Sequence, residues 1–176
     1  MLKFMMLFIF ISNFIFANEI KQKTEHIINQ EFGINVQIKF IKYIIPVKIK
    51  NEIEKNSRQK FFSESILIWS IKENDSLLAV GIMDNVFGKA QPITFITFLN
   101  LQGEILSNHI VKYREEHGGA VSNLDWNKQF IGMTLDSDFN EIDAISGATI
   151  SVNSIKKGVL KLVLLFKTLD KTELWK

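Results

Sequence analysis

The alternation of apolar and polar positions divides the chain into predicted helices and strands. Apolar residues three and four positions apart predict a weakly amphipathic helix over residues 19–32, ending at Gly33. Residues 34–45 alternate as a strand does, although a continued helix could carry the same pattern. Pro46 then opens a charged helix that we expect to reach about Lys60, since proline is tolerated in the first turn. Together these elements form an N-terminal helix and strand region, residues 18–60.

From Phe61 onward, short apolar runs are joined by polar turns. Residues 65–71 and 76–83 form one predicted hairpin, and residues 93–101 and 104–113 form a second that turns at Gly103. The run 93–101 is apolar on both faces, which predicts an internal strand covered by helices. A long amphipathic helix follows Thr149. We therefore predict an α+β fold, an antiparallel sheet with helices packed on it, with residues 61–176 as one domain.

The first seventeen residues have the pattern of a targeting segment. Lys3 gives a positive start, residues 4–16 are almost wholly apolar, and Ala17 precedes a polar stretch. This pattern predicts a secretory signal peptide over residues 1–17, and with it a periplasmic or otherwise exported protein. The apolar run is shorter than the roughly 20 residues of a membrane-spanning helix. An uncleaved anchor, which would keep the protein membrane-associated, remains the alternative because Ile15 is not small.

Composition removes several classes of chemistry. The chain of 176 residues has no cysteine, which excludes disulfides, iron–sulfur ligation, cysteine-based zinc sites and a lipid anchor on cysteine. A formal net charge of +2 with scattered lysines offers no footprint for nucleic acid. The three histidines have no familiar metal-ligand spacing, so we predict no metal site.

The segment Asp143–Thr149 places a hydroxyl among very small residues. Gly147 and Ala148 precede Thr149 at the start of the last predicted helix. The unpaired N–H groups and the positive dipole end of that helix favour a phosphate. An ordinary helix cap by Thr149 or Ser151, with Gly147 making the turn, explains the same residues.

A second constellation lies at the end of the strand that starts near Glu104. Glu115 leads into a glycine loop at Gly118 and Gly119, and an aromatic segment, residues 123–132, follows. From the residues alone this is a solvated hairpin end, with the two aromatic side chains of that segment, Trp126 and Phe130, in the core.

The first constellation, Asp-x-x-Ser-Gly-Ala-Thr, resembles the flavinylation motif of the FMN-binding domain family. That family includes the C subunit of the sodium-translocating NADH:quinone reductase and the G subunit of the Rnf complexes. In it, the last threonine of the motif carries FMN through a phosphoester bond, attached by a flavin transferase that consumes FAD. The resemblance implies that Thr149 is the attachment residue and that Asp143, Ser146, Gly147 and Ala148 are the recognition sequence around it.

The second constellation resembles the same family in the same order along the chain. Glu115 and Gly118 match its Glu-Thr-Pro-Gly loop, with Glu116 and His117 in place of threonine and proline. The later segment is matched by Trp126, Gln129, Phe130 and Gly132. The likeness covers about residues 76–165. It implies that Glu115 and the backbone of Gly118 and Gly119 border the flavin ring. For Trp126 and Phe130 we favour a place in the core over stacking on that ring.

The resemblance implies an exported electron-transfer flavoprotein with covalent FMN and no catalytic residues of its own. Its implied partners are the flavin transferase and redox proteins such as a membrane reductase or a cytochrome. Two alternatives stay open. One is a flavin-dependent reductase of a small substrate, for which Glu116 and His117 are the candidate proton donors. The other is a flavin-free binding module that retains the fold.

Overall fold

The computed structural model describes residues 19–74 and 76–170, so the predicted signal segment lies outside the described residues. The chain divides into two compact units, one up to Val36 and the other from Gln37 onward. In the first unit, residues 19–32 form the predicted helix. It ends at Gly33, whose φ of 90° suits glycine and whose N–H donates to the carbonyl of Asn29 at 3.1 Å.

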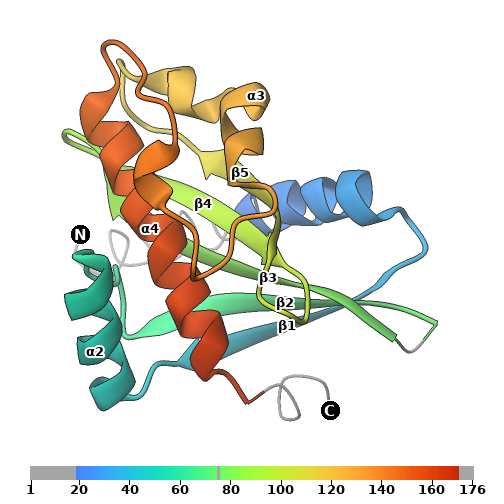
Figure 1. Cartoon of the computed structure of the whole chain (residues 1–176). Coiled ribbons are helices and arrows are strands. Elements are labelled where there is room, and N and C mark those ends of the chain that lie inside the picture. The colour runs from blue at the N-terminus through green and yellow to red at the C-terminus, as the bar shows by residue number, and fades with distance from the viewer. Residues whose placement is uncertain (1–18, 75, 171–176) are drawn as a thin grey trace, which may run out of the picture. The chain divides into compact units, whose positions relative to one another are not determined.

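The second unit contains a five-stranded antiparallel sheet in which every strand pairs with its neighbour in sequence (Figure 1). Its strands are β1 (Gln37–Ile44), β2 (Ser65–Glu73), β3 (Ser76–Phe87), β4 (Pro92–Leu99) and β5 (Ile105–Lys112). Both predicted hairpins are present, as β2–β3 and β4–β5. The strand expected within residues 34–45 is β1, and it pairs with β2. The predicted α+β fold is therefore confirmed.

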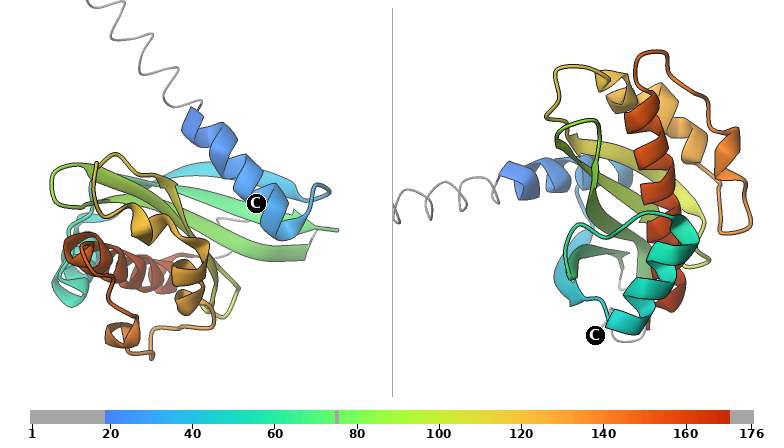
Figure 2. Two further views of the ribbon diagram at one scale, coloured as in Figure 1. Left: turned by 90° about the horizontal axis from the view of Figure 1, so that it is seen from above. Right: turned by 90° about the vertical axis from the view of Figure 1, so that its left-hand side faces the viewer.

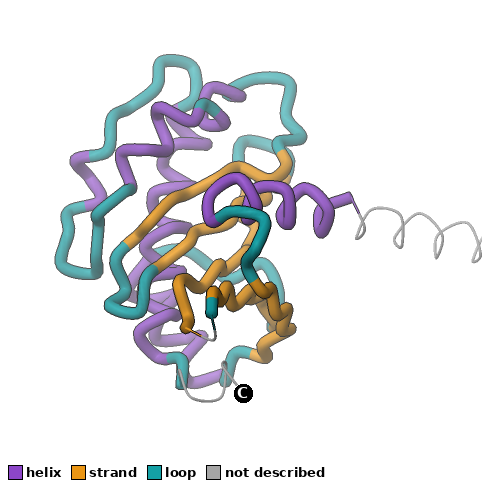
Figure 3. The backbone as a smooth tube through the Cα atoms, turned by 90° about the vertical axis from the view of Figure 1, so that its right-hand side faces the viewer, coloured by secondary structure: helices purple, strands orange, loops and turns teal. Residues whose placement is uncertain are grey.

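Two helices cover one face of this sheet, and they run next to each other (Figure 2). These are α2 (Val47–Ser57) and the long α4 (Thr149–Thr168). Between β5 and α4 the chain is mostly loop with short helical turns (Figure 3). Those turns are η1 (Gly119–Ser122), α3 (Leu124–Asn127), η2 (Lys128–Phe130) and η3 (Phe139–Glu141). Within residues 19–74 and 76–170, no helix has the length and apolar character needed to cross a bilayer.

Close packing fixes where α4 crosses the sheet. A Cβ added at Gly158 would lie 2.8 Å from Val86 Cγ1 and 2.9 Å from Phe95 Cζ, so the helix backbone lies directly on β3 and β4. Three residues further along, Lys161 Nζ pairs with Asp84 Oδ2 of β3 at 2.7 Å, both side chains being buried. These contacts hold α4 in place along the sheet, and α4 begins at Thr149.

Candidate functional site

A pocket of about 270 Å³ lies where the first turn of α4 meets the loops that follow β3 and β5. Its lining residues are Lys89, Glu115, His117, Gly118, Gly147, Ala148, Thr149, Ile150 and Ser151. The structure thus brings the Glu115–Gly118 loop and the end of the Asp143–Thr149 segment into one pocket, although about thirty residues separate them. Three other predicted site residues, Asp143, Ser146 and Gly119, are exposed and do not line it.

Thr149 is the first residue of α4, and its side chain is exposed. The N-cap position is held by Ala148, and no side-chain hydrogen bond caps the helix. The interpretation of Thr149 or Ser151 as an ordinary cap is therefore wrong. Gly147 makes the turn into the helix with a φ of 77°, a backbone conformation that residues other than glycine rarely adopt. The turn leaves the Thr149 hydroxyl accessible from outside the fold.

The start of the Asp143–Thr149 segment is held through its main chain. Trp126 Nε1 donates to the carbonyl of Asp143 at 2.9 Å, and Gln129 Oε1 accepts the Asp143 N–H at 2.9 Å. Trp126 is buried and meets the buried ring of Phe130 edge-on, with centroids 5.5 Å apart. The predicted core role of these two aromatic residues is confirmed. The Trp126 indole and the Gln129 amide thus link the two matched segments.

Lys156 was not predicted as part of this region. This residue lies in the second turn of α4, and its Nζ donates to the carbonyls of Asn140 and Ile142 at 3.0 and 2.9 Å. It therefore ties α4 to the loop that leads into Asp143. A single lysine on a helical face carries no distinguishing sequence pattern, so this role is visible only in the fold.

Glu115 holds the β3–β4 loop rather than standing free in the pocket. Its Oε1 accepts the N–H groups of Ala90 and Gln91 at 2.8 and 3.0 Å. Hydrogen bonds from Gln91 and Ala90 lower the pKa of the Glu115 carboxyl, because they favour its charged form. A Cβ at Gly88 would come within 2.4 Å of the same oxygen, so this approach requires glycine. The clamp places Lys89 at the pocket, a residue that the sequence did not single out.

Gly118 joins the loop after β5 to the first turn of α4. It has a φ of 80°, and a Cβ there would lie 2.7 Å from the Tyr113 hydroxyl and 3.2 Å from Ser151 Oγ. The Tyr113 hydroxyl donates to the carbonyl of His117 and lies 3.3 Å from Ser151 Oγ. The predicted importance of Gly118 thus has a physical basis in close packing as well as in backbone conformation.

A buried polar network supports residues 119–127, the part of the chain that follows the Glu115–Gly118 loop. Thr97 Oγ1 donates to Asn108 Oδ1, and Asn108 Nδ2 donates to Asn127 Oδ1, at 2.8 and 2.7 Å. Asn127 Nδ2 in turn donates to the carbonyls of Val121 and Asn123. Because these polar groups are buried, each one depends on its partner. The network therefore fixes η1 and α3 against β4 and β5.

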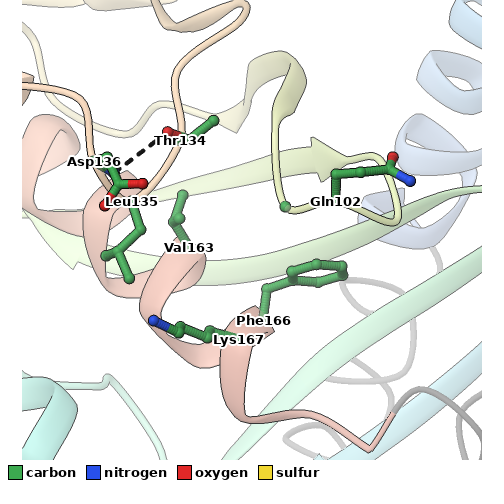
Figure 4. Close-up of a pocket in the computed structure, with 8 residues that line it drawn as sticks. Gln102, Thr134, Leu135, Asp136, Val163, Phe166 and Lys167 are labelled. Atoms are coloured by element: carbon green, nitrogen blue, oxygen red, sulfur yellow. Dashed lines mark hydrogen bonds between the residues drawn. The ribbon is translucent and has the colours of Figure 1, made fainter.

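A second pocket of about 230 Å³ lies near the other end of α4 (Figure 4). Val163, Phe166 and Lys167 of α4 line it with Gln102 and the Thr134–Asp136 loop, in which the Asp136 N–H donates to Thr134 Oγ1. At 1.5 Å per residue, Val163 lies about 21 Å along the helix from Thr149. None of the predicted site residues lines this pocket. Across the described parts of the chain, no cluster of three metal-ligating side chains is assembled.

Comparison with known proteins identifies relatives of this part of the chain. Residues 88–163 match the FMN-binding domain, a span that includes both walls of the Thr149 pocket. The chain is also 29% identical over 110 residues to the G subunit of the ion-translocating oxidoreductase complex of Stutzerimonas stutzeri. That similarity covers 54% of this chain and 48% of the relative, so the chain spans about half the length of that protein. The relationship is a distant homology.

Proposed function

We propose that this chain, whose residues 88–163 match the FMN-binding domain, is an exported electron-transfer flavoprotein that carries FMN on Thr149. One observation supports the attachment residue above all. Thr149 is the exposed first residue of α4, and it lines the same pocket as Glu115 and Gly118. A hydroxyl in that position is accessible to a modifying enzyme, and a group attached to it is close to the loop.

The proposed attachment is a phosphoryl transfer from FAD, catalysed by a flavin transferase. The Thr149 oxygen attacks the phosphorus on the FMN side of the pyrophosphate, and the new oxygen–phosphorus bond forms as the bond to AMP breaks. AMP leaves, and the hydroxyl proton passes to a base of the transferase. No oxidant or reductant is consumed, and the flavin ring is unchanged.

The pocket suits part of FMN rather than the whole molecule. Sites that enclose a drug-sized ligand have volumes of about 300–1,000 Å³, and this pocket has about 270 Å³. The phosphate and the adjoining chain of FMN would fit it, and the ring would then lie outside this volume. The N–H groups of the first turn of α4 would hold that phosphate. Gly118 lets its loop lie close to this turn, because a Cβ there would be 3.2 Å from Ser151 Oγ. Once bound, FMN supplies reversible one- or two-electron chemistry.

An exposed ring suits exchange of electrons with other proteins, and a covalent bond prevents loss of the cofactor outside the cytoplasm. We therefore propose a periplasmic or otherwise exported location, with or without an N-terminal anchor. The proposed partners are the flavin transferase and redox proteins, such as a membrane reductase or a cytochrome. Similarity to one subunit of an ion-translocating oxidoreductase complex supports redox partners of this kind.

A flavin-dependent reductase of a small substrate is the second candidate. It is favoured by His117, which lines the pocket and could donate a proton, whereas the exposed Glu116 does not line it. A flavin-free binding module is the third. Turnover of a soluble substrate by the purified flavoprotein would favour the reductase, and protein that stays colourless in the presence of the transferase would favour the module.

Intact-mass spectrometry tests the proposal. The wild type and the Thr149→Ala and Thr134→Ala variants are each coexpressed with a flavin transferase. Thr134 is the matched control, a threonine of the second pocket. We expect one FMN-phosphoryl adduct on the wild type and on Thr134→Ala, and none on Thr149→Ala. An unmodified wild type, or an adduct that persists in Thr149→Ala, contradicts the proposed attachment.

A further inference from the structure

We propose that Lys89 is the positively charged partner of the phosphodiester carried by Thr149, and that Glu115 is the positioning residue that keeps Lys89 at the pocket. This inference rests on the proposed function and extends it to residues outside the attachment motif. Lys89 follows Gly88 in the loop between β3 and β4, far from Thr149 in sequence. Both line the same pocket.

The charges at the pocket supply the first argument. Among the described residues that line it, Lys89 is the one lysine and Glu115 the one acidic residue. The Glu115 oxygen facing the loop already accepts two main-chain N–H groups. A phosphodiester on Thr149 adds one negative charge to this small space. An ammonium group within reach of that charge gives a charge-assisted hydrogen bond.

The geometry of the two loops supplies the second argument. The Lys89 loop is closed by the Gly88 N–H, which donates to the carbonyl of Gln91 at 3.1 Å, and Glu115 Oε1 clamps it from the other side. The loop that contains Glu115 is tied in turn to α4, where the Tyr113 hydroxyl lies 3.3 Å from Ser151 Oγ. These linked contacts fix the main chain of Lys89 relative to the first turn of α4.

The side chain of Lys89 keeps the freedom that this role needs. Lys89 is exposed, so its long aliphatic stem can turn towards the phosphate without unfolding any element. The ion pair between Lys161 and Asp84 differs from this contact, because both of its charged groups are buried. An exposed pair is screened by salt, so the contact between Lys89 and the phosphodiester should weaken as ionic strength rises.

Phosphorus NMR of the flavinylated protein tests the assignment directly. Wild type, Lys89→Met, Lys89→Arg and Lys157→Met are each coexpressed with the transferase, and intact mass first measures the adduct. Lys157 is the matched control, an exposed lysine of α4 outside this pocket. At about 0.1 M salt, where the screening length is about 10 Å, the phosphodiester resonance of Lys89→Met should be displaced from the wild-type position. Lys89→Arg and Lys157→Met should match the wild type.

A change of salt concentration and substitutions at Glu115 separate an effect of charge on the resonance from an effect of structure. Raising the salt to about 1 M, where the screening length is about 3 Å, should move the wild-type resonance towards that of Lys89→Met and leave Lys89→Met in place. Glu115→Ala should resemble Lys89→Met. Glu115→Gln retains an oxygen acceptor for Ala90 and Gln91 but loses the charge that attracts Lys89, so its resonance should lie closer to the wild type than that of Glu115→Ala.

The outcomes are distinct. A wild type without adduct overturns the proposed function and this inference together. An adduct whose resonance is the same in Lys89→Met and in the wild type overturns the role of Lys89 alone. A wild-type resonance in Glu115→Ala overturns the positioning role of Glu115. If Lys89→Met takes no adduct while Lys89→Arg does, the charge acts in the attachment step and the assignment to the finished phosphodiester is wrong.

Discussion

Removing Lys161 should destabilise the fold strongly, because its partner is a buried carboxylate. Lys161 is 0% and Asp84 5% exposed, and their charged atoms are 2.7 Å apart. Lys161 Nζ also donates to the carbonyl of Lys60 at 2.8 Å and lies 4.6 Å from the centre of the Phe61 ring. Burial raises the pKa of Asp84 and lowers that of Lys161, and their mutual attraction opposes both shifts.

The magnitude follows from the charge that is left behind. Lys161→Met keeps most of the side-chain volume but leaves Asp84 charged and buried, which costs about 3–5 kcal/mol. At about 2–4 °C per kcal/mol for a domain of this size, the melting temperature should fall by roughly 6–20 °C. Adding Asp84→Asn should recover part of this loss. The amide oxygen can still accept the Asn85 N–H, which donates to Asp84 Oδ1 at 2.7 Å.

The loss in Lys161→Met should also depend on pH. Burial raises the pKa of the remaining Asp84 carboxyl above its value in the unfolded chain, so the folded variant takes up a proton first as pH falls. Its stability relative to the wild type should therefore be greatest at low pH and decrease as pH rises through the pKa of folded Asp84. Glu54 also attracts Lys161, and it is unchanged in every variant.

Urea unfolding, followed by tryptophan fluorescence at several pH values, measures the stability of each variant. Lys157→Met is the control, an exposed lysine on the same helix, and it should change stability by less than about 0.5 kcal/mol. The reasoning is refuted if Lys161→Met lies within about 1 kcal/mol of the wild type. It is also refuted if the double variant is no more stable than Lys161→Met, or if the loss is the same at every pH.

Three further substitutions test the supports of the pocket. Gly118→Ala combines a φ of 80° with a Cβ that would lie 2.7 Å from the Tyr113 hydroxyl, so it should cost about 1–3 kcal/mol in thermal unfolding, whereas Gly119→Ala should cost less. Asn127→Leu leaves the buried Asn108 amide without its acceptor, and a loss of about 1–3 kcal/mol is expected in urea unfolding; a stability equal to the wild type would contradict the network. The pKa of Glu115 is lower in the folded protein than in the unfolded chain. Its contribution to the stability of the fold is therefore present above the pKa of the unfolded carboxyl, and it is lost as pH falls through the folded-state pKa. Acid titration of Glu115→Gln should therefore show a smaller decrease in stability on the acid side than the wild type, and an identical decrease would contradict the clamp.

Local patterns were sufficient to predict the strands, the longer helices and the candidate attachment residue. The period of apolar positions defined both hairpins and the final helix, because that period depends only on which faces are buried. Gly147 was recognisable as a turn residue because positive φ angles favour glycine whatever surrounds it, and Gly118 was identified by its match to a motif. The threonine that ends Asp143–Thr149 was identified by its resemblance to a motif, which is a property of contiguous residues.

Contacts between distant segments were decided only in the folded chain. The sequence alone did not reveal that Glu115 clamps the loop before β4, that Lys156 holds the loop before Asp143, or that Lys161 is buried against Asp84. No local pattern at these lysines or at Glu115 indicates such partners, since the folded sheet brings them near. The sequence by itself therefore determined which residues turn and which pack, whereas the cap that it suggested at Thr149 or Ser151 is not formed. The tertiary structure decided which charges and hydrogen-bonding groups meet, because these interactions act over a few ångströms and depend on packing between remote parts of the chain.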